Sequence, residues 1–147
     1  MDGKAQHYFQ IHLNLFEENW KPFEDVIPCL EAHKEYRLGI ITNGDSTQQR
    51  QKLKKIGIFD YFEIVIAAGD IGVSKPNTEI FRYACSMAQE HPADRIYIGD
   101  NLETDIFPCE KIDMKGIWLN RKNEIKGQEH IRTIKILFDL PKILENM

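Results

Sequence analysis

Short, nearly continuous apolar runs recur along this chain, and segments with helical periodicity separate the first four of them. Strands of a parallel sheet are apolar along their length because both of their faces are covered, whereas half-exposed antiparallel strands alternate. The alternation of strands and helices therefore predicts an α/β fold, a parallel sheet of the Rossmann type with helices on both faces. The expected strands are residues 37–42, 63–67, 95–99 and 115–119, with a last edge strand at 131–136.

Capping and turn residues set the ends of the expected helices. Ser46 can cap a helix, and Gly57 can end it as a residue in the left-handed region does. Pro76 fits the first position of the next helix, and Pro108 is expected to bend or shorten a later one. Residues 69–74 are expected to form a loop. The expected helices are residues 25–36, 46–56, 76–89, 103–112 and 139–145.

Residues 5–20 fit two patterns. Apolar and polar residues alternate from Phe9 to Leu15, which is typical of a strand. However, Phe9, Leu13 and Phe16 also share one face of a helix. We favour the helix for this segment.

Composition excludes several classes of protein. The 147 residues are 42% apolar and 29% charged, as in one globular domain. The net charge is -4 and no basic cluster is present, so no nucleic-acid partner is expected. The apolar runs are too short to span a bilayer and no secretory signal begins the chain, which predicts a cytoplasmic protein without a membrane partner. The scattered cysteines favour packed side chains over a disulfide framework or a zinc site; they are Cys29, Cys85 and Cys109.

Polar turns come at, or soon after, the ends of the expected strands 37–42 and 63–67. Parallel sheets bind ligands at the carboxyl ends of their strands. Thr42 offers a hydroxyl at a strand tip, and the Asn43-Gly44 turn offers free backbone N–H groups, a combination that can hold phosphoryl oxygens. Lys75, held extended by the proline after it, can present its ammonium to an anion. Taken alone, the first feature could be an ordinary turn, and the second could be a surface lysine.

A third polar turn carries acids. Asp100 follows the apolar strand that ends at Gly99, and Asp105 comes five residues later, at the start of a helix. A carboxylate in such a turn suits a hard cation such as Mg²⁺. Asp100 is the expected ligand, directly or through water, and Asp105 either completes the outer shell or orients Lys75. Together the three turns predict a site that holds a phosphoryl group beside Mg²⁺.

This set of motifs resembles the haloacid dehalogenase-like (HAD) superfamily of hydrolases, most of which are phosphatases. Residues 42–44 are similar to its second motif, residues 75–76 to its third, and residues 99–105 to its fourth. Residues 114–121 look like the next strand and exit loop of the family, and the resemblance covers about residues 20–145.

The resemblance implies a role for each matched residue. Thr42, Asn43 and Gly44 are expected to bind phosphate, Lys75 to steady it, and Asp100 to hold Mg²⁺. The implied cofactor is therefore Mg²⁺, and the implied substrate is a small phosphorylated metabolite.

The family's nucleophile has no counterpart in this sequence. Family members use an aspartate in an Asp-x-Asp-x-Thr/Val motif at the tip of their first strand, which forms an aspartyl-phosphate. No two aspartates in this chain are spaced by one residue, and neither Asp2 nor Asp25 follows an expected strand. The resemblance thus implies a truncated phosphatase domain that is inactive alone and binds Mg²⁺ more weakly.

The missing motif also has a structural consequence. Residues 1–20 would be a remnant of the helical cap or an N-terminal arm, and residues 21–147 a HAD-like core without the family's first strand and most of its cap. Because that strand lies in the middle of the family's sheet, its loss would leave backbone groups unpaired. We expect the gap to close by pairing of strands 37–42 and 95–99, or to be filled by another segment or a second chain.

Two functions remain open. One is the phosphatase domain described above. The other is a non-catalytic phosphate-binding or assembly module that forms a homodimer, or pairs with a complementing chain, through unpaired sheet edges. The order of the motifs argues against a phosphoacceptor receiver domain, and no Gly-x-Gly-x-x-Gly supports a dinucleotide-binding domain.

Overall fold

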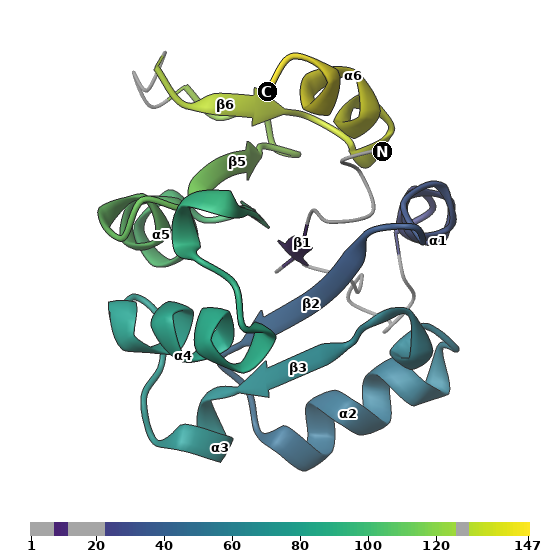
Figure 1. The fold of residues 1–147 in the computed structure, drawn as a ribbon. Helices are drawn as coiled ribbons and strands as arrows, with labels where there is room; N and C mark the ends of the chain where they lie inside the picture. Colours follow the sequence, from purple (N-terminus) through teal and green to yellow (C-terminus); the bar gives the residue numbers. More distant parts are fainter. Residues whose placement is uncertain (1–7, 12–22, 126–129) are drawn as a thin grey trace.

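A single parallel sheet organises the protein in a computed structural model that describes residues 8–11, 23–125 and 130–147 (Figure 1). Within these residues the sheet has six strands in the order β3-β2-β1-β4-β5-β6, and every neighbouring pair is parallel. The α/β fold class and the parallel sheet are therefore confirmed. The strands are β1 (Tyr8–Ile11), β2 (Arg37–Thr42), β3 (Ile64–Ala67), β4 (Arg95–Gly99), β5 (Lys115–Leu119) and β6 (Arg132–Ile134).

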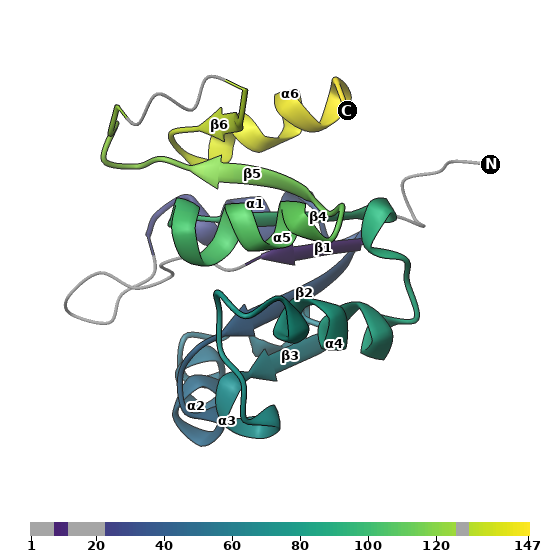
Figure 2. The ribbon, with the colours of Figure 1, turned by 90° about the vertical axis from the view of Figure 1, so that its left-hand side faces the viewer.

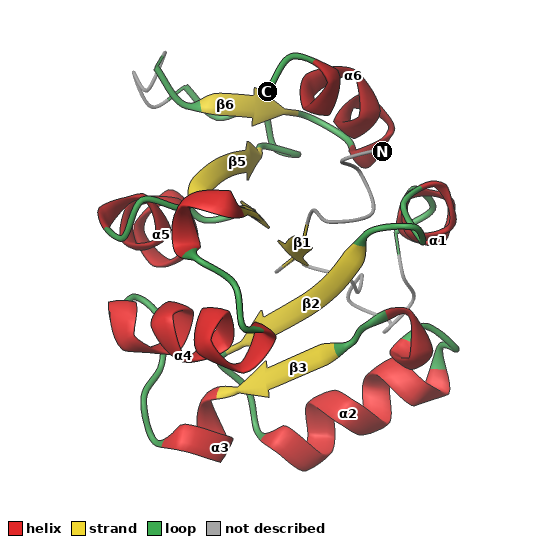
Figure 3. Ribbon diagram, viewed as in Figure 1, coloured by secondary structure: helices red, strands yellow, loops and turns green. Residues whose placement is uncertain are grey.

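Helices connect the first five strands and lie on both faces of the sheet, as Figures 1 and 3 show. No helix in the described part of the chain combines the length and the apolar character that crossing a bilayer requires. The α-helices are α1 (Val26–Ala32), α2 (Ser46–Lys55), α3 (Ala68–Ile71), α4 (Thr78–Ala88), α5 (Phe107–Lys111) and α6 (Leu140–Glu145).

Alternate residues of β2, β3 and β4 enter two separate cores. Ile40 and Ile98 face the side covered by α1, α2 and α6, whereas Ile41 and Tyr97 face α4 and α5. Figure 2 shows α4 and α5 together on the near face of the sheet. Coverage on both faces explains why these strands are apolar throughout. The three cysteines are buried and unpaired, as predicted.

β1 occupies the centre of the sheet, between β2 and β4 (Figure 1). Its residues pair with both neighbours; Gln10 is opposite Gly39 on one side and Tyr97 on the other. The prediction of a helix was wrong for residues 8–11. They form a strand whose backbone groups pair with β2 on one side and β4 on the other, whereas a helix would pair them within itself. The rest of the predicted helix lies outside the described residues, and the domain boundary at residue 20 stays a prediction.

The filled centre settles how the sheet avoids unpaired backbone groups. Of the three alternatives, filling by another segment of the same chain is the one observed, and β2 does not pair directly with β4. The outer strands of the described sheet are β3 and β6.

Several helix ends differ from the predicted ones. Asp45, not Ser46, caps α2 by accepting the Gln48 N–H at 2.9 Å. Asn77 caps α4, so Pro76 precedes this helix instead of opening it. The predicted 69–74 loop overlaps α3, and α1 is shorter than predicted.

The predicted helix at residues 103–112 is interrupted. Leu102–Ile106 form a π-helical turn, and α5 follows it. Pro108 has no N–H to donate to the preceding turn, which explains why regular α-helix does not run through this segment.

A largely buried ion pair fastens the start of α1 to the segments that follow β5 and β6. Asp25 accepts two hydrogen bonds from the Arg121 guanidinium, at 2.8 and 2.9 Å, and a third from the Leu137 N–H at 2.8 Å. These contacts join segments that are 96 and 112 residues apart in sequence. Asp25 thus holds the loop after β5 and the start of the C-terminal segment in place.

We expect Asp25→Asn to destabilise the fold by about 2–4 kcal/mol, because the Arg121 cation loses its carboxylate partner in a largely buried place. Urea denaturation followed by circular dichroism measures the change. The exposed Asp60 provides a matched control, and Asp60→Asn should change stability by less than about 0.5 kcal/mol. Equal effects of the two substitutions would contradict this role of Asp25.

The effect of Asp25→Asn should also depend on pH. Burial alone would raise the pKa of Asp25, but the Arg121 guanidinium and the Leu137 N–H stabilise the carboxylate and hold the pKa below its ordinary 3.8. A lowered carboxyl pKa stabilises the fold above the unfolded value, and this contribution is lost as the pH falls through the folded value. The stability difference between the two proteins should therefore be constant above about pH 5 and shrink below about pH 4.

Candidate functional site

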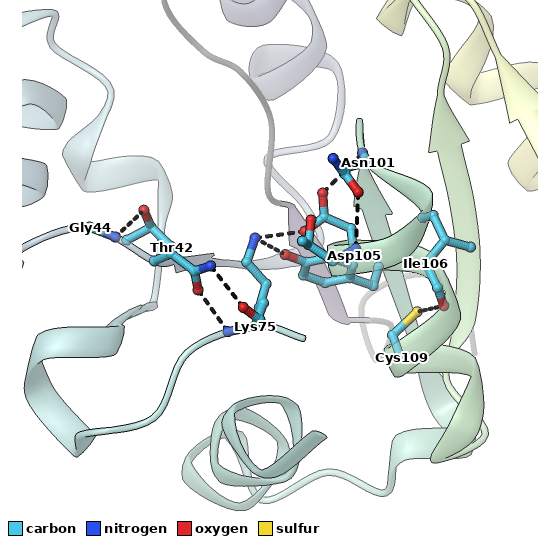
Figure 4. A network of polar contacts seen from close by, with 10 residues as sticks. Thr42, Gly44, Lys75, Asn101, Asp105, Ile106 and Cys109 are labelled. Carbon is cyan, nitrogen blue, oxygen red and sulfur yellow. Dashed lines mark hydrogen bonds and ion pairs between the residues drawn. The ribbon is translucent and has the colours of Figure 1, made fainter. Parts of the chain in front are cut away.

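The predicted site residues lie at the carboxyl end of the sheet, where β2 and β4 end. Thr42 is the last residue of β2, and Asp100 follows the last residue of β4. Figure 4 shows the amine of Lys75 pointing from its loop towards Asp105, with Thr42 on the other side of Lys75. The structure therefore brings together residues from three distant parts of the sequence.

Lys75 lies at the centre of this cluster. Its Nζ is 2.6 Å from Oδ1 of Asp105 and donates to the hydroxyl of Tyr97 at 3.3 Å. The Lys75 side chain is only 2% exposed and that of Asp105 1%. An ammonium has three N–H donors, so two are used by described residues and one is left for another acceptor.

Burial changes the proton affinity of the groups around Lys75. It lowers the pKa of Lys75 from its ordinary 10.5, while the negative charges of Asp105 and Asp100 act in the opposite direction. Burial also raises the pKa of Tyr97 well above 10.0, and the charge of Asp105 adds to this. The tyrosine is thus neutral at physiological pH and donates or accepts as a hydroxyl.

Asn43 fixes the backbone of Lys75. Its side-chain amide donates to the Lys75 carbonyl at 3.0 Å and accepts the Lys75 N–H at 2.8 Å. These two bonds join the turn after β2 to the loop before α4. The side chain of Asn43 is therefore occupied within the protein, and only its backbone N–H matches the predicted contact with phosphate.

The turn after Thr42 differs from the prediction in one respect. The N–H of Gly44 is not free, because it donates to Oγ1 of Thr42 at 3.3 Å. This bond is long for an N–H···O contact and therefore weak. The hydroxyl proton of Thr42 is still available as a donor, since Oγ1 acts here as the acceptor.

Asp105 is held by both of its oxygens. Oδ1 faces Lys75, and Oδ2 accepts the N–H of Asn101 at 3.2 Å. Gly99 allows this close approach, because a Cβ at position 99 would lie 2.7 Å from Cγ of Asp105. Of the two roles predicted for Asp105, the geometry matches the orientation of Lys75.

Asp100 is the carboxylate that faces outward. It is exposed, and its backbone carbonyl accepts the indole N–H of Trp118 at 3.2 Å. Among the described residues, no three His, Cys, Asp or Glu side chains form a cluster that could hold a metal ion. One carboxylate with phosphate oxygens and water is nevertheless a common way to bind Mg²⁺, so Asp100 fits a partial magnesium site.

Sequence reasoning missed Tyr97, Asn101 and Trp118. A tyrosine within an otherwise aliphatic strand was the available signal for Tyr97, because a buried hydroxyl needs a partner. Asn101 caps the following turn by accepting the Thr104 N–H at 3.0 Å, a common role for asparagine after a strand. No signal in the sequence linked Trp118 to Asp100.

Comparison with known proteins agrees with this arrangement. Residues 1–119 match the family of haloacid dehalogenase-like hydrolases. The chain is 31% identical over 146 residues to the pyrimidine 5′-nucleotidase YjjG of Escherichia coli. This alignment covers 97% of this chain and 64% of that protein. It is 36% identical over 103 residues to a glyceraldehyde 3-phosphate phosphatase of Methanopyrus kandleri, covering 69% of this chain and 44% of the relative.

Solved structures show the same fold. A HAD phosphatase from Thermococcus onnurineus superposes with a TM-score of 0.79 at 34% identity, over 84% of this chain and 58% of that one. The HAD hydrolase YfnB from Bacillus subtilis, solved with bound magnesium, gives a TM-score of 0.79 at 25% identity, over 85% and 57%.

The chain spans less than two thirds of each of these four proteins. The family match nevertheless covers most of its length, and it includes the three polar turns at the sheet edge. The chain therefore belongs to the haloacid dehalogenase-like hydrolase family.

Proposed function

We propose that Thr42, Lys75 and Asp100, at the carboxyl end of the sheet, bind the phosphoryl group of a small phosphate monoester together with Mg²⁺. The observation that carries the proposal is the buried ammonium of Lys75, which Asp105 and Tyr97 hold and whose third N–H no other described residue accepts. Relatives named for the dephosphorylation of nucleotides and of glyceraldehyde 3-phosphate support a phosphorylated metabolite as the ligand.

Each residue has a distinct role in this proposal. The Thr42 hydroxyl and the backbone N–H groups of Asn43 and Gly44 donate to phosphoryl oxygens, for which the weak Gly44–Thr42 bond opens. Lys75 adds a charged donor. Its position is fixed, because Asp105 holds the ammonium and the side chain of Asn43 holds the backbone. Asp100 is the protein ligand of Mg²⁺, which supplies charge neutralisation at the phosphoryl oxygens when bound.

Charge balance implies that phosphate binding depends on the metal. Lys75 carries one positive charge, whereas Asp105 and Asp100 carry two negative charges between them. A phosphate dianion alone would therefore approach a site of net negative charge. With Mg²⁺ at Asp100 the site becomes positive, which favours the dianion.

We propose further that these 147 residues, taken alone, hold the phosphoryl group without hydrolysing it by the family's route. That route needs an attacking aspartate, and residues 3–24 contain none. Lys75, Asp105 and Thr42 do not substitute for it: the first two neutralise each other, and a lone hydroxyl has no neighbouring base among its described contacts.

The second candidate is a module whose attacking carboxylate comes from a different polypeptide. A phosphate-holding edge in a sequence without the nucleophile motif favours it. A second copy of these residues has the same sequence and cannot supply that motif. Because β1 fills the centre of the sheet, such a partner would need to bring a carboxylate and not a strand.

We expect the purified chain to bind inorganic phosphate when Mg²⁺ is present and to lose most of this binding in EDTA. It should hydrolyse p-nitrophenyl phosphate no faster than its Asp100→Asn variant does. Isothermal titration calorimetry and release of nitrophenol measure the two properties. Magnesium-dependent hydrolysis that Asp100→Asn abolishes would disprove the predicted inactivity, and absence of phosphate binding would disprove the site.

Removing the ammonium should weaken phosphate binding at least about tenfold, since a charge-assisted hydrogen bond contributes about 1.5–3 kcal/mol. Lys75→Met alone would leave Asp105 buried and unpaired, so the double variant Lys75→Met/Asp105→Asn is the better test. Its thermal melting shows whether it folds. Lys55→Met, at the exposed end of α2, is the control and should bind phosphate as the unmodified chain does.

Trp118 offers a direct test of the metal position, because its indole N–H donates to the backbone of Asp100. In a Trp20→Phe background it is the sole tryptophan. Adding Mg²⁺ should change its fluorescence in a saturable way, and Asp100→Asn should remove the response. A response that is unaltered by Asp100→Asn would place the ion elsewhere.

A further inference from the structure

Tyr97, the middle residue of β4, places a hydroxyl inside the core next to Lys75. The side chain is fully buried, and its oxygen accepts a hydrogen bond from Nζ of Lys75 at 3.3 Å. The same hydroxyl forms a hydrogen bond with the carboxylate of Asp105. Because an ionised carboxylate can only accept, the hydroxyl proton of Tyr97 is directed to Asp105 and an oxygen lone pair to Lys75.

Lys75, Tyr97 and Asp105 thus form a closed ring of three hydrogen bonds. The ammonium donates to Asp105 at 2.6 Å and to Tyr97 at 3.3 Å, and the tyrosine hydroxyl donates to the carboxylate. The second oxygen of Asp105 accepts the N–H of Asn101 at 3.2 Å, which keeps the carboxylate from turning. Only the third N–H of Lys75 points out of this ring.

Packing holds the tyrosine ring in one orientation. The ring of Phe81, from α4, meets the ring of Tyr97 edge-on, with the centroids 5.0 Å apart and an interplanar angle of 85°. Both side chains are completely buried. A fixed phenol ring puts its hydroxyl oxygen at a fixed point, whereas the ammonium of Lys75 ends a flexible four-carbon chain. The direction of the ammonium therefore depends on the acceptors that hold it.

Two acceptors fix the direction of the third N–H of Lys75, and one would not. With Asp105 alone, the ammonium could pivot about a single hydrogen bond. The three N–H bonds of an ammonium are tetrahedral, so when two of them point at Tyr97 and Asp105 the third points away from both. Figure 4 shows Thr42 on the side of Lys75 opposite to Asp105. The third N–H therefore faces the side of the turn after β2.

We infer that Tyr97 is a positioning residue of the phosphate site, whose hydroxyl keeps the third N–H of Lys75 pointing at the phosphoryl group. The inference rests on the proposed function, because Lys75 acts on the ligand only if phosphate binds beside it. Tyr97 does not touch the ligand itself, since it is fully buried. Its effect on binding passes through Lys75 and should vanish when the ammonium is removed.

Tyr97→Phe removes the hydroxyl and keeps the ring that packs against Phe81. It should weaken the binding of inorganic phosphate about fivefold, because the ammonium loses one of the two acceptors that direct it. Calorimetry with Mg²⁺ present measures this loss. Tyr83→Phe removes the hydroxyl of an exposed tyrosine on α4, and this control should bind phosphate as the unmodified chain does.

A double-mutant cycle separates the positioning of Lys75 from general support of the fold. In the Lys75→Met/Asp105→Asn background, Tyr97→Phe should change phosphate binding by less than about twofold. A purely structural role would give the same loss in both backgrounds. Melting temperatures show whether each variant folds. Where Tyr97→Phe does not fold, Tyr97→Met takes its place in the cycle, because methionine also lacks the hydroxyl and adapts its shape to a core.

Two results would overturn the inference while the proposed function stands: phosphate binding that loss of the Tyr97 hydroxyl leaves intact, or a loss of equal size with and without the Lys75 ammonium. Failure of the unmodified chain to bind phosphate with Mg²⁺ present would overturn both the inference and the proposed function.

Discussion

Lys75 carries a positive charge into a place that water hardly reaches, and the arrangement of the site follows from how that charge is balanced. A buried ammonium without a partner would lose its proton or unfold its surroundings. Asp105 prevents this at 2.6 Å, and Gly99 leaves the space that Asp105 needs. The ion pair therefore links the loop before α4 to the end of β4, so that the strand ends cannot shift independently.

The central strand β1 is the second requirement, because the two halves of the sheet meet on it. β2 and β3 form one half and β4, β5 and β6 the other, and both β2 and β4 pair with β1 in parallel register. Thr42 and Asp100 end the strands on either side of β1. Their spacing across the site is thus set by one strand's width, about 4.8 Å on each side.

Much of this could be predicted from the sequence, and the exceptions have physical causes. The bounds of β2, β4 and β5 were predicted to the residue, because buried parallel strands are apolar throughout. The segment around β1 was misjudged because its alternating residues fit both periods, and only pairing on two sides decides between them. The contact of Trp118 with Asp100 was out of reach, since nothing local in a strand tells which backbone carbonyl an indole on the neighbouring strand will meet.

Asparagine is used twice in the same way on the two sides of Asp100. Asn43 binds both backbone groups of Lys75, and Asn120 binds both backbone groups of Glu124. A side-chain amide imitates a peptide group, so each asparagine pairs with a loop as a neighbouring strand would. These amide bonds hold the loop backbone and so use neither the ammonium of Lys75 nor the carboxylate of Glu124. The ammonium of Lys75 therefore keeps one N–H that no described residue accepts, and an anionic ligand at the carboxyl end of the sheet can accept it.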